Sequence, residues 1–368
     1  MHNQGIVDAL NAAVADRVVP GMVLGVRNGN TNRFMLVAGM RTQIPSPEPM
    51  SPDTVFDLAS LTKVLATTTL SMRLAERRVL ELDRPLADYS ADLYTGDIGR
   101  LTPRFLLAHC AGLPASYVFY RTWDPYAPDP EVQRQSALRY RFRATKLVHE
   151  PGRTTLYSDI GLILLGDLIE HVCQARLDHV FNAEVAQPLE LADTFFRHLD
   201  DPLEQARRPA AAFAATEQCA WRGTLMRGWV HDENAYLLRG VAGHAGLFAT
   251  LTDVMQVAEA LMNAYHGEGH YLQADTVHEF VDGPELVPGS NRVLGWSKAT
   301  PEASCGRHFS TDAFGHTGFT GTSVWIDPGP RRVVVLLSNR IHPTRDNTAF
   351  VRFRPGLHDL VVHSLNQT

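Results

Sequence analysis

Residues 313–338 read AFGHTGFTGTSVWIDPGPRRVVVLLS, and this stretch sets the fold class. Glycine and proline turns divide it into three short runs, Ala313–Thr317, Thr322–Asp327 and Arg332–Ser338, and Arg292–Ser297 is a fourth run before it. Short strands separated by such turns are typical of an antiparallel sheet. The C-terminal part of the chain is therefore predicted to build one.

The N-terminal part is similar, whereas the middle is not. Met22–Asn28 and Arg33–Met40 predict two more strands around a turn at Gly29. Apolar periodicity predicts the helices 3–17, Leu58–Val79, Asp159–Val172, Leu251–Tyr265 and Asp346–Leu365.

We therefore predict an α+β fold of two domains. Residues 1–75 plus 285–368 form a discontinuous domain, an antiparallel sheet flanked by helices, and residues 76–284 form a mainly helical second domain. The cleft between them is the expected site, and the loops around 115–150 and 200–235 are its expected walls.

Composition narrows the class of partner. The 368 residues carry a net charge of −6, without a basic tract, so nucleic acid is not expected. No apolar run approaches the roughly 18 residues that a membrane span needs. Asp8, Asp16 and Arg17 stand where a signal peptide would be apolar. We expect a cytoplasmic protein, or a periplasmic one if a signal peptide was removed before the numbering begins.

No metal or cofactor is expected. The four cysteines are widely spaced and form no CxxC pair, so neither a disulfide framework nor a zinc site is predicted. The sequence holds 16 histidines but no HExxH motif. A metallohydrolase is therefore the weakest hypothesis, since His266 and His270 lie among glycines that make a poor helix.

Ser60-Leu61-Thr62-Lys63 places a serine and a lysine on one face at the start of a predicted helix. The chain has 15 serines and only three lysines, so random placement would give about 0.1 such pairs. A serine needs a nearby base to become a nucleophile, and a lysine with a lowered pKa can serve, whereas arginine stays protonated.

Two further segments carry groups suited to catalysis. Tyr157-Ser158-Asp159 precedes a helix, whose positive end together with a lysine would help the phenol to shuttle protons, and Asp159 is a plausible N-cap. His316-Thr317-Gly318 lies in a strand, and the glycine lets a ligand approach the strand edge. An N–H on that edge and the N–H of Ser60 would form an oxyanion hole.

In this order and at these distances, the three segments resemble the motifs of the penicillin-recognising serine hydrolases. That family includes class C β-lactamases, DD-peptidases and family VIII carboxylesterases, and the similarity runs over almost the whole chain. Supporting segments include Leu106–His109 with Gly112–Pro114, Glu150–Gly152, Leu294–Trp296 and Ser338–Arg340. A narrower resemblance, to a bacterial branch of β-lactamase-related hydrolases, lies in Val230–Ala235, Gly240–Phe248 and Asn339–Thr344.

The resemblance implies a β-lactamase/transpeptidase-like fold and a role for each matched residue. Ser60 would form the acyl-enzyme, and Lys63 and Tyr157 would share the proton transfers. The N–H groups of Ser60 and Phe319 would hold the oxyanion, with Thr317 and Gly318 beside the substrate. His316 would replace the family's usual lysine. His231-Asp232 is interpreted as a structural turn.

Two departures from the family pattern bear on the substrate. The second motif often ends in asparagine, which can donate to a substrate carbonyl, whereas an ionised Asp159 only accepts. It would also keep Lys63 charged within about 4–6 Å, which shifts the base toward Tyr157. His316 is only marginally charged at neutral pH, so it would bind a carboxylate less well than lysine does.

These departures favour small or neutral esters, or a specialised peptide, over efficient β-lactam turnover. We therefore predict a carboxylesterase-type or β-lactamase-related serine hydrolase acting on a small ester, β-lactam or peptide. The alternatives are a DD-carboxypeptidase-like peptidase for D-amino-acid or cell-wall peptides, and a penicillin-binding sensor that is acylated without turnover.

Overall fold

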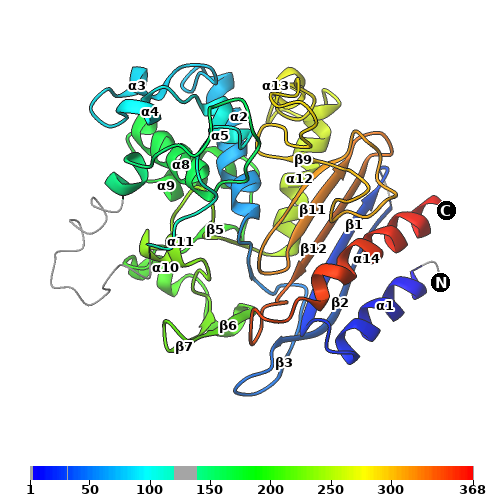
Figure 1. The fold of residues 1–368 in the computed structure, drawn as a ribbon. Coiled ribbons are helices and arrows are strands. Elements are labelled where there is room, and N and C mark those ends of the chain that lie inside the picture. Colours follow the sequence, from blue (N-terminus) through cyan, green and yellow to red (C-terminus); the bar gives the residue numbers. More distant parts are fainter. Residues whose placement is uncertain (1–2, 31, 120–138, 368) are drawn as a thin grey trace.

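The structure, a computed structural model, describes residues 3–30, 32–119 and 139–367. Its centre is a seven-stranded antiparallel sheet with the strand order β3-β2-β1-β12-β11-β10-β9 (Figure 1). The strands are β1 Gly21–Asn28, β2 Asn32–Thr42, β3 Glu48–Pro49, β9 Ser297–Lys298, β10 Phe314–Thr317, β11 Ser323–Asp327 and β12 Arg332–Ser338. The predicted α+β class is confirmed.

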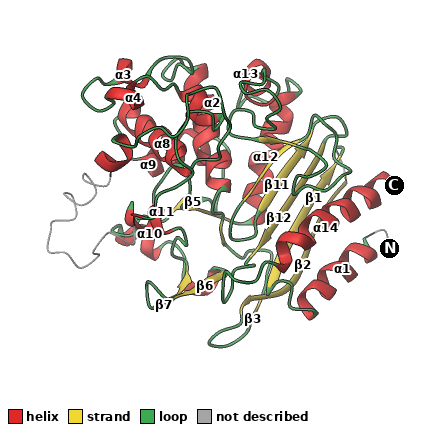
Figure 2. Ribbon diagram, in the orientation of Figure 1, coloured by secondary structure: helices red, strands yellow, loops and turns green. Residues whose placement is uncertain are grey.

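The two ends of the chain meet at the centre of this sheet. β1 pairs with β12 in a register that sets Met22 opposite Ser338 and Asn28 opposite Arg332. Every residue of β12 is buried, because helices cover both faces of the sheet there (Figure 2). The pairing explains why the strand-rich ends of the sequence form one sheet.

Two terminal helices pack on one face of the sheet, and a third helix packs on the other. α1 (Gln4–Ala15) buries Ile6, Leu10 and Ala13, whose spacing lines one side of a helix. α14 (Ala349–Asn366) lies beside α1, and α12 (Leu251–Tyr265) packs against β1, β11 and β12 from the opposite side.

The middle of the chain contains short helices and two small sheets. The small strands are β4 Phe56–Asp57, β5 Phe195–Phe196 and β8 Leu247–Ala249 in one sheet, and β6 Ala215–Cys219 with β7 Thr224–Arg227 in the other. The remaining helices are η1 Lys63–Thr68, α2 Thr69–Glu76, α3 Leu86–Tyr89, α4 Gly96–Gly99, α5 Pro103–Leu107, α8 Asp159–Cys173, α9 Leu177–Phe181, η2 Asn182–Ala186, α10 Pro202–Ala206, η3 Ala210–Ala212, α11 Glu233–Leu237 and α13 Ala274–Val281.

Two details of the predicted elements are wrong. The helix expected from Leu58 begins only after Ser60, because β4 holds the preceding residues extended against β8, and its first part, η1, is a π-helix. The strand expected over Arg292–Ser297 is a turn at Gly295, closed by a single bridge between its two ends.

The predicted domain boundaries stay a prediction. α12, which they assign to the helical domain, packs against the sheet, and one hydrophobic cluster contains residues from both parts. Over the described ranges, the structure contains no helix long and apolar enough to cross a membrane.

Close backbone contact between α8 and the loop before β8 predicts a sensitive position. A Cβ at Gly243 would lie 2.1 Å from the carbonyl oxygen of Leu162 and 3.1 Å from Cα of Gly166. We expect Gly243→Ala to destabilise the protein by about 1–3 kcal/mol, measured by urea unfolding. Gly5→Ala is the control, because nothing lies within 4 Å of its Cβ and it should be neutral or slightly stabilising. Equal stability of the two variants would contradict the packing described.

Candidate active site

Ser60 and Lys63 meet as their spacing predicts. Ser60 occupies the turn between β4 and the helix, and Lys63 is the first residue of η1. The Lys63 side chain is fully buried, and its Nζ lies 2.9 Å from the Oγ of Ser60. The hydroxyl of the nucleophile candidate thus contacts a lysine ammonium that is buried away from solvent.

The Lys63 ammonium has three hydrogen-bond acceptors. They are the Ser60 Oγ at 2.9 Å, the His244 carbonyl oxygen at 2.9 Å and the Asp159 Oδ1 at 2.8 Å. An ammonium has three hydrogens, so each one has an acceptor. Burial alone would lower the pKa of Lys63, but the charges of Asp159 and Tyr157 outweigh it and raise that pKa above its ordinary value. Lys63 is therefore a charged donor.

Asp159 is the first residue of α8, and Ser158, rather than Asp159, caps that helix. The Ser158 Oγ accepts from the Gly161 N–H at 3.2 Å. The predicted cap is wrong because the Asp159 carboxylate binds Lys63 instead. The distance lies well inside the range in which a carboxylate keeps a lysine charged.

Four groups surround the Tyr157 ring. The Lys63 Nζ and the Arg292 guanidinium carbon each lie 5.0 Å from the ring centroid. The rings of His109 and His316 lie 4.6 Å and 5.9 Å from it. Tyr157 thus joins the lysine of the first motif to the histidine of the third, as the family resemblance implies.

Both histidines are neutral. Burial, followed by the charges of Arg292 and Lys63, holds the pKa values of His109 and His316 well below the ordinary value. The His316 Nδ1 lies 2.9 Å from the Thr317 carbonyl and donates to it, which leaves the Nε2 as an acceptor. That Nε2 is buried and has no partner among the described residues.

Arg292 is a site residue that the sequence interpretation missed. Its Nη1 is buried, and no hydrogen-bond acceptor within the described ranges reaches it. Arg292 also lines a pocket of about 410 Å³, together with Arg104, whose guanidinium binds Asp83 and Glu279. With 31 arginines in the chain, nothing in the sequence singles out this one.

The turn before Ser60 is strained and held by a buried carboxylate. Ala59 has a φ of +47°, which is unusual for a residue with a Cβ. The Asp57 Oδ1 accepts from the Ala59 N–H at 2.8 Å, and its Oδ2 accepts from the His231 N–H at 2.7 Å. Asp57 is therefore a positioning residue for the nucleophile candidate.

Two threonine hydroxyls join this turn to the β10–β11 turn, residues 318–322. Thr320 donates to the Asp57 carbonyl at 2.7 Å, and Thr322 donates to the Leu58 carbonyl at 3.0 Å. A Cβ at Gly318 would lie 2.5 Å from that Leu58 oxygen, so only glycine permits this approach.

The proposed oxyanion donors lie on these two joined turns. Ser60 is on the first turn and Phe319 on the second. In the described part of the chain, neither N–H has a hydrogen-bond partner. They are free to bind a substrate oxygen. Thr317 is the last residue of β10, opposite Ser323.

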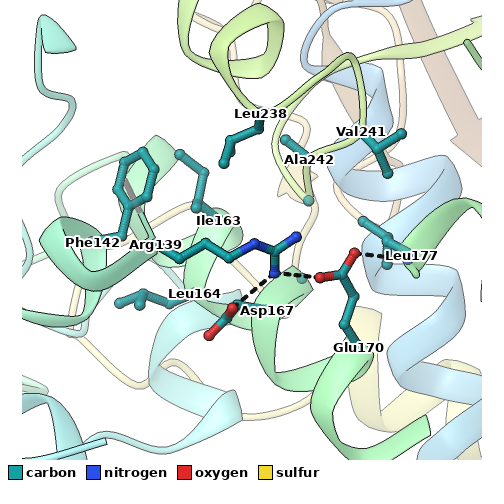
Figure 3. Close-up of a pocket in the computed structure, with 12 residues that line it drawn as sticks. Arg139, Phe142, Ile163, Leu164, Asp167, Glu170, Leu177, Leu238, Val241 and Ala242 are labelled. Carbon is teal, nitrogen blue, oxygen red and sulfur yellow. Dashed lines mark hydrogen bonds and ion pairs between the residues drawn. The ribbon is translucent and has the colours of Figure 1, made fainter. Parts of the chain in front are cut away.

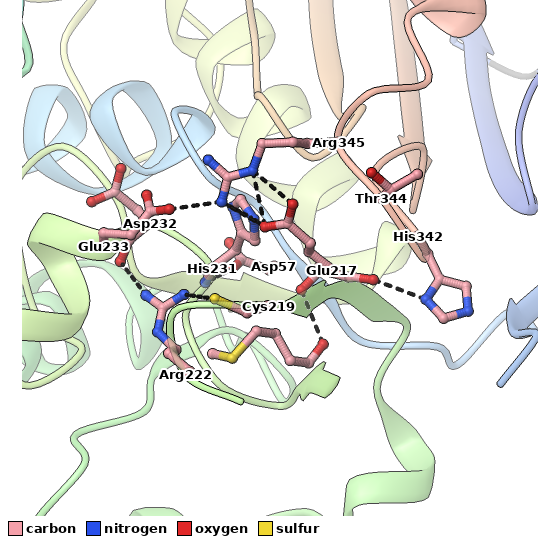
Figure 4. A network of polar contacts seen from close by, with 12 residues as sticks. Asp57, Glu217, Cys219, Arg222, His231, Asp232, Glu233, His342, Thr344 and Arg345 are labelled. Atoms are coloured by element: carbon pink, nitrogen blue, oxygen red, sulfur yellow. Dashed lines mark hydrogen bonds and ion pairs between the residues drawn. The ribbon is translucent and has the colours of Figure 1, made fainter. Parts of the chain in front are cut away.

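The Phe319 side chain packs on His231, which belongs to a network of polar contacts with Glu217 and Arg345 (Figure 4). The ring is 48% exposed and stacks on His231 at 5.8 Å between centroids. The His231 Nε2 lies 3.0 Å from the Glu217 Oε2, and Arg345 binds both Glu217 and Glu233.

Asp232, the residue after His231, links α11 to the candidate site. Asp232 caps α11 by accepting from the Ala235 N–H at 2.8 Å, and it lies 2.9 Å from the His244 Nε2. The carbonyl of His244 is an acceptor for Lys63. Asp232 thus contacts the site through His244, and the interpretation of His231-Asp232 as a structural turn stays a prediction.

The pocket behind α8 is separate from this site (Figure 3). Arg139 binds Asp167 at 3.0 Å and also contacts Glu170 there. The space is about 20 Å³, enough for one water molecule. Residues 120–138, which belong to the first predicted substrate wall, lie outside the described residues. The described parts of the two predicted walls are in contact, because Asn234 donates to the Tyr117 carbonyl at 2.9 Å.

No metal centre is found: among the described residues, histidines, cysteines and carboxylates form no group of three or more that could hold an ion. The groups gathered at this candidate site are Ser60, Lys63, Tyr157 and the two N–H donors. Such a set is suited to covalent acyl transfer.

Comparisons with known proteins show the family to which the chain belongs. The model of the family described as "Beta-lactamase" matches residues 6–352. The N-acetylmuramyl-L-alanine amidase of Bacillus subtilis (strain 168) is 31% identical over 321 residues, which cover 80% of this chain and 70% of that protein. A protein of Escherichia coli (strain K12) named "Putative D-alanyl-D-alanine carboxypeptidase" is 32% identical over 324 residues, 80% of this chain and 71% of its own.

A solved structure shows the same fold. EstCE1, described as a hydrolase with promiscuous acyltransferase activity, superposes with a TM-score of 0.72 at 22% identity, covering 98% of this chain and 97% of its own. The likeness extends over the sheet and the helical part together. The β-lactamase/transpeptidase-like fold is confirmed.

The Thr320 hydroxyl gives a test of the junction between the two turns. Thr320→Val keeps the side-chain shape but loses the hydrogen bond to Asp57. We expect kcat for p-nitrophenyl acetate to fall about tenfold or more, with little change in KM, because the two N–H donors lose their fixed spacing. Thr320→Ser keeps the hydroxyl and should keep most of the activity. If the valine and serine variants were equally active, the hydroxyl would have no positioning role.

Proposed function

The chain belongs to the beta-lactamase family, whose members are serine hydrolases, and we propose that Ser60 is the nucleophile of an acyl-enzyme mechanism. The contact between the Ser60 hydroxyl and the charged, buried Lys63 is the single observation that carries the proposal. A buried ammonium held this way beside a hydroxyl stabilises negative charge on the serine oxygen.

In the acylation step, the Ser60 Oγ bonds to the substrate carbonyl carbon, and its proton passes to the oxygen of Tyr157, which acts as the phenolate. Lys63 is charged and therefore has no lone pair with which to accept it. The Lys63 Nζ and the Arg292 guanidinium carbon both lie 5.0 Å from the Tyr157 ring centroid, so two positive charges face the ring in this step. The carbonyl oxygen, as it becomes an oxyanion, accepts from the N–H groups of Ser60 and Phe319.

Collapse of the tetrahedral intermediate completes acylation. The bond between the carbonyl carbon and the leaving group breaks, and Tyr157 returns the proton to the leaving nitrogen or oxygen. Deacylation repeats these steps with water as the nucleophile, and the proton taken from that water returns to the Ser60 Oγ. Thr317 and Gly318 line the strand edge along which the substrate lies.

The substrate we favour carries an amide or peptide bond beside a carboxylate. His316 is neutral and supplies no cation, but Arg292 does, and its Nη1 lacks an acceptor within the described ranges. A buried unpaired donor is costly, so a substrate carboxylate that pairs with it gains affinity. The two curated relatives, named as an amidase and a carboxypeptidase, support this class of substrate.

The cellular location is a separate question, and a cytoplasmic location stays a prediction.

Hydrolysis of small esters is the second candidate. Asp159 accepts hydrogen bonds and cannot donate to a substrate amide oxygen, which is the departure that favours esters. Ester substrates also need less leaving-group protonation than amides. The same Ser60 acyl-enzyme serves both candidates, so the substrate series below separates them.

The nucleophile is tested by comparing wild type with Ser60→Ala on p-nitrophenyl acetate, a chromogenic cephalosporin and an N-acylated D-Ala-D-Ala peptide. We expect turnover to fall at least about 10³-fold in Ser60→Ala. Ser364→Ala, on α14, is the control and should retain full activity. Equal rates in wild type and Ser60→Ala would refute the mechanism. A cephalosporin adduct on Ser60, seen by intact mass without turnover of any substrate, would indicate a sensor.

The role of Arg292 is tested with a matched pair of peptides, one ending in a free carboxylate and one in a neutral amide. We expect Arg292→Gln to lower the ratio of their kcat/KM values, charged over neutral, about tenfold or more. Arg104→Gln is the control, because Arg104 lines the same pocket but is already paired with Asp83 and Glu279. An unchanged ratio in Arg292→Gln would remove the carboxylate from the proposed substrate.

A further inference from the structure

Two buried arginines lie behind the β10–β11 turn that carries the Phe319 N–H. Arg340 follows β12, and Arg354 lies in α14. Each is only 6% exposed. Neither takes part in the steps described so far.

Both arginines contact the turn itself. The Arg354 Nη1 lies 3.5 Å from the Thr322 carbonyl oxygen, which also accepts the Gly318 N–H at 2.7 Å. The Arg340 N–H donates to the Thr320 carbonyl at 3.1 Å, and its guanidinium carbon lies 4.7 Å from the Phe319 ring centroid. The Arg340 guanidinium therefore lies against the Phe319 side chain, and the Arg354 guanidinium lies at the end of the turn that carries the Phe319 N–H.

In the described part of the chain, these two charges have no carboxylate partner. Of the residues with described positions, no acid lies within ion-pair distance of Arg340 or Arg354, whereas the neighbouring Arg345 binds Glu217 and Glu233. Arg340 donates to the Asn347 carbonyl at 3.2 Å, and the buried Nε of Arg354 has no acceptor in the described part.

Both groups nevertheless stay charged. Burial lowers the pKa of Arg340, and burial together with the Arg340 charge lowers the pKa of Arg354 to about 10, still far above neutrality. An unpaired buried charge destabilises a folded protein. The fold therefore bears a cost at this turn, which two carbonyl acceptors and the Phe319 ring offset only in part, because no carboxylate among the described residues pairs with either charge.

We propose that Arg340 and Arg354 supply a permanent positive field at the oxyanion hole, which stabilises the tetrahedral intermediate formed on Ser60. The inference rests on the proposed function. Neither arginine touches the substrate; each acts through the turn that holds the Phe319 N–H. Fixed charges in a low-dielectric site need no reorganisation when the oxyanion forms, so their attraction is retained in the transition state.

This role makes a prediction that a purely structural role does not. Removing an unpaired buried charge should leave the protein as stable as before or more stable, while activity falls. A residue that merely holds the fold together would instead lose stability and activity together. The two readouts therefore have opposite signs.

The experiment compares wild type, Arg354→Met and Arg354→Lys on p-nitrophenyl acetate, with thermal unfolding of each protein. For Arg354→Met we expect kcat to fall about tenfold with KM nearly unchanged and Tm equal or higher, and Arg354→Lys should recover most of the activity. A phenylboronic acid, which forms a tetrahedral anion on the serine, should bind Arg354→Met more weakly by about the same factor.

Arg332→Met is the matched control. Arg332 is also buried and donates to Asn28 and Asn366, but it lies at the opposite end of β12 from the turn. We expect its kcat to equal that of wild type. An unchanged kcat in Arg354→Met, or a loss that a fall in Tm accompanies, would overturn the inference. Ser60→Ala, measured alongside, separates the two failures, because its retained activity would refute the proposed function itself.

Discussion

The buried ammonium of Lys63 organises the rest of the site. Its three hydrogens bind Ser60, Asp159 and the His244 carbonyl, which come from three separate segments of the chain. A buried ammonium is most readily tolerated where such acceptors surround it. The segments around Ser60, α8 and the loop before β8 are therefore held in one arrangement, and a lysine fixed in that state cannot also be the base. We therefore propose that the proton transfers fall to Tyr157.

A second constraint acts on the backbone. The positive φ of Ala59 turns the chain sharply before Ser60, and the Asp57 carboxylate holds that turn through two N–H groups. Thr320 and Thr322 attach the opposite turn to the same segment. The nucleophile candidate and both oxyanion donors thus belong to one hydrogen-bonded unit that is assembled before any substrate arrives. Preorganisation of this kind is the largest contribution to catalysis in many hydrolases.

The sequence predicts the parts of this protein that local patterns encode. The strands at both ends, the helical middle and the Ser60–Lys63 pair follow from spacing and alternation, and the structure bears out the fold class. The π-helix at Lys63 and the late helix start do not follow, because they depend on the pairing of Phe56 and Asp57 with β8, about 190 residues away. The sequence interpretation did not identify Arg292 and Arg354, for a different reason. An arginine's partners, or their absence, are set by tertiary contacts, and no local pattern records them.

The pairing of β1 with β12 also means that the central sheet cannot be completed until late in synthesis. Met22 lies opposite Ser338, so the inner edge of the first hairpin has no neighbour until nearly the whole chain has been made. An open strand edge of apolar residues is a template for wrong pairing. Contacts so distant in sequence also form slowly, because the loop between them must close first. Because both ends of the chain pair in one sheet, the edge of β1 stays unpaired for most of synthesis. During that time it must be kept from pairing with strands of other chains.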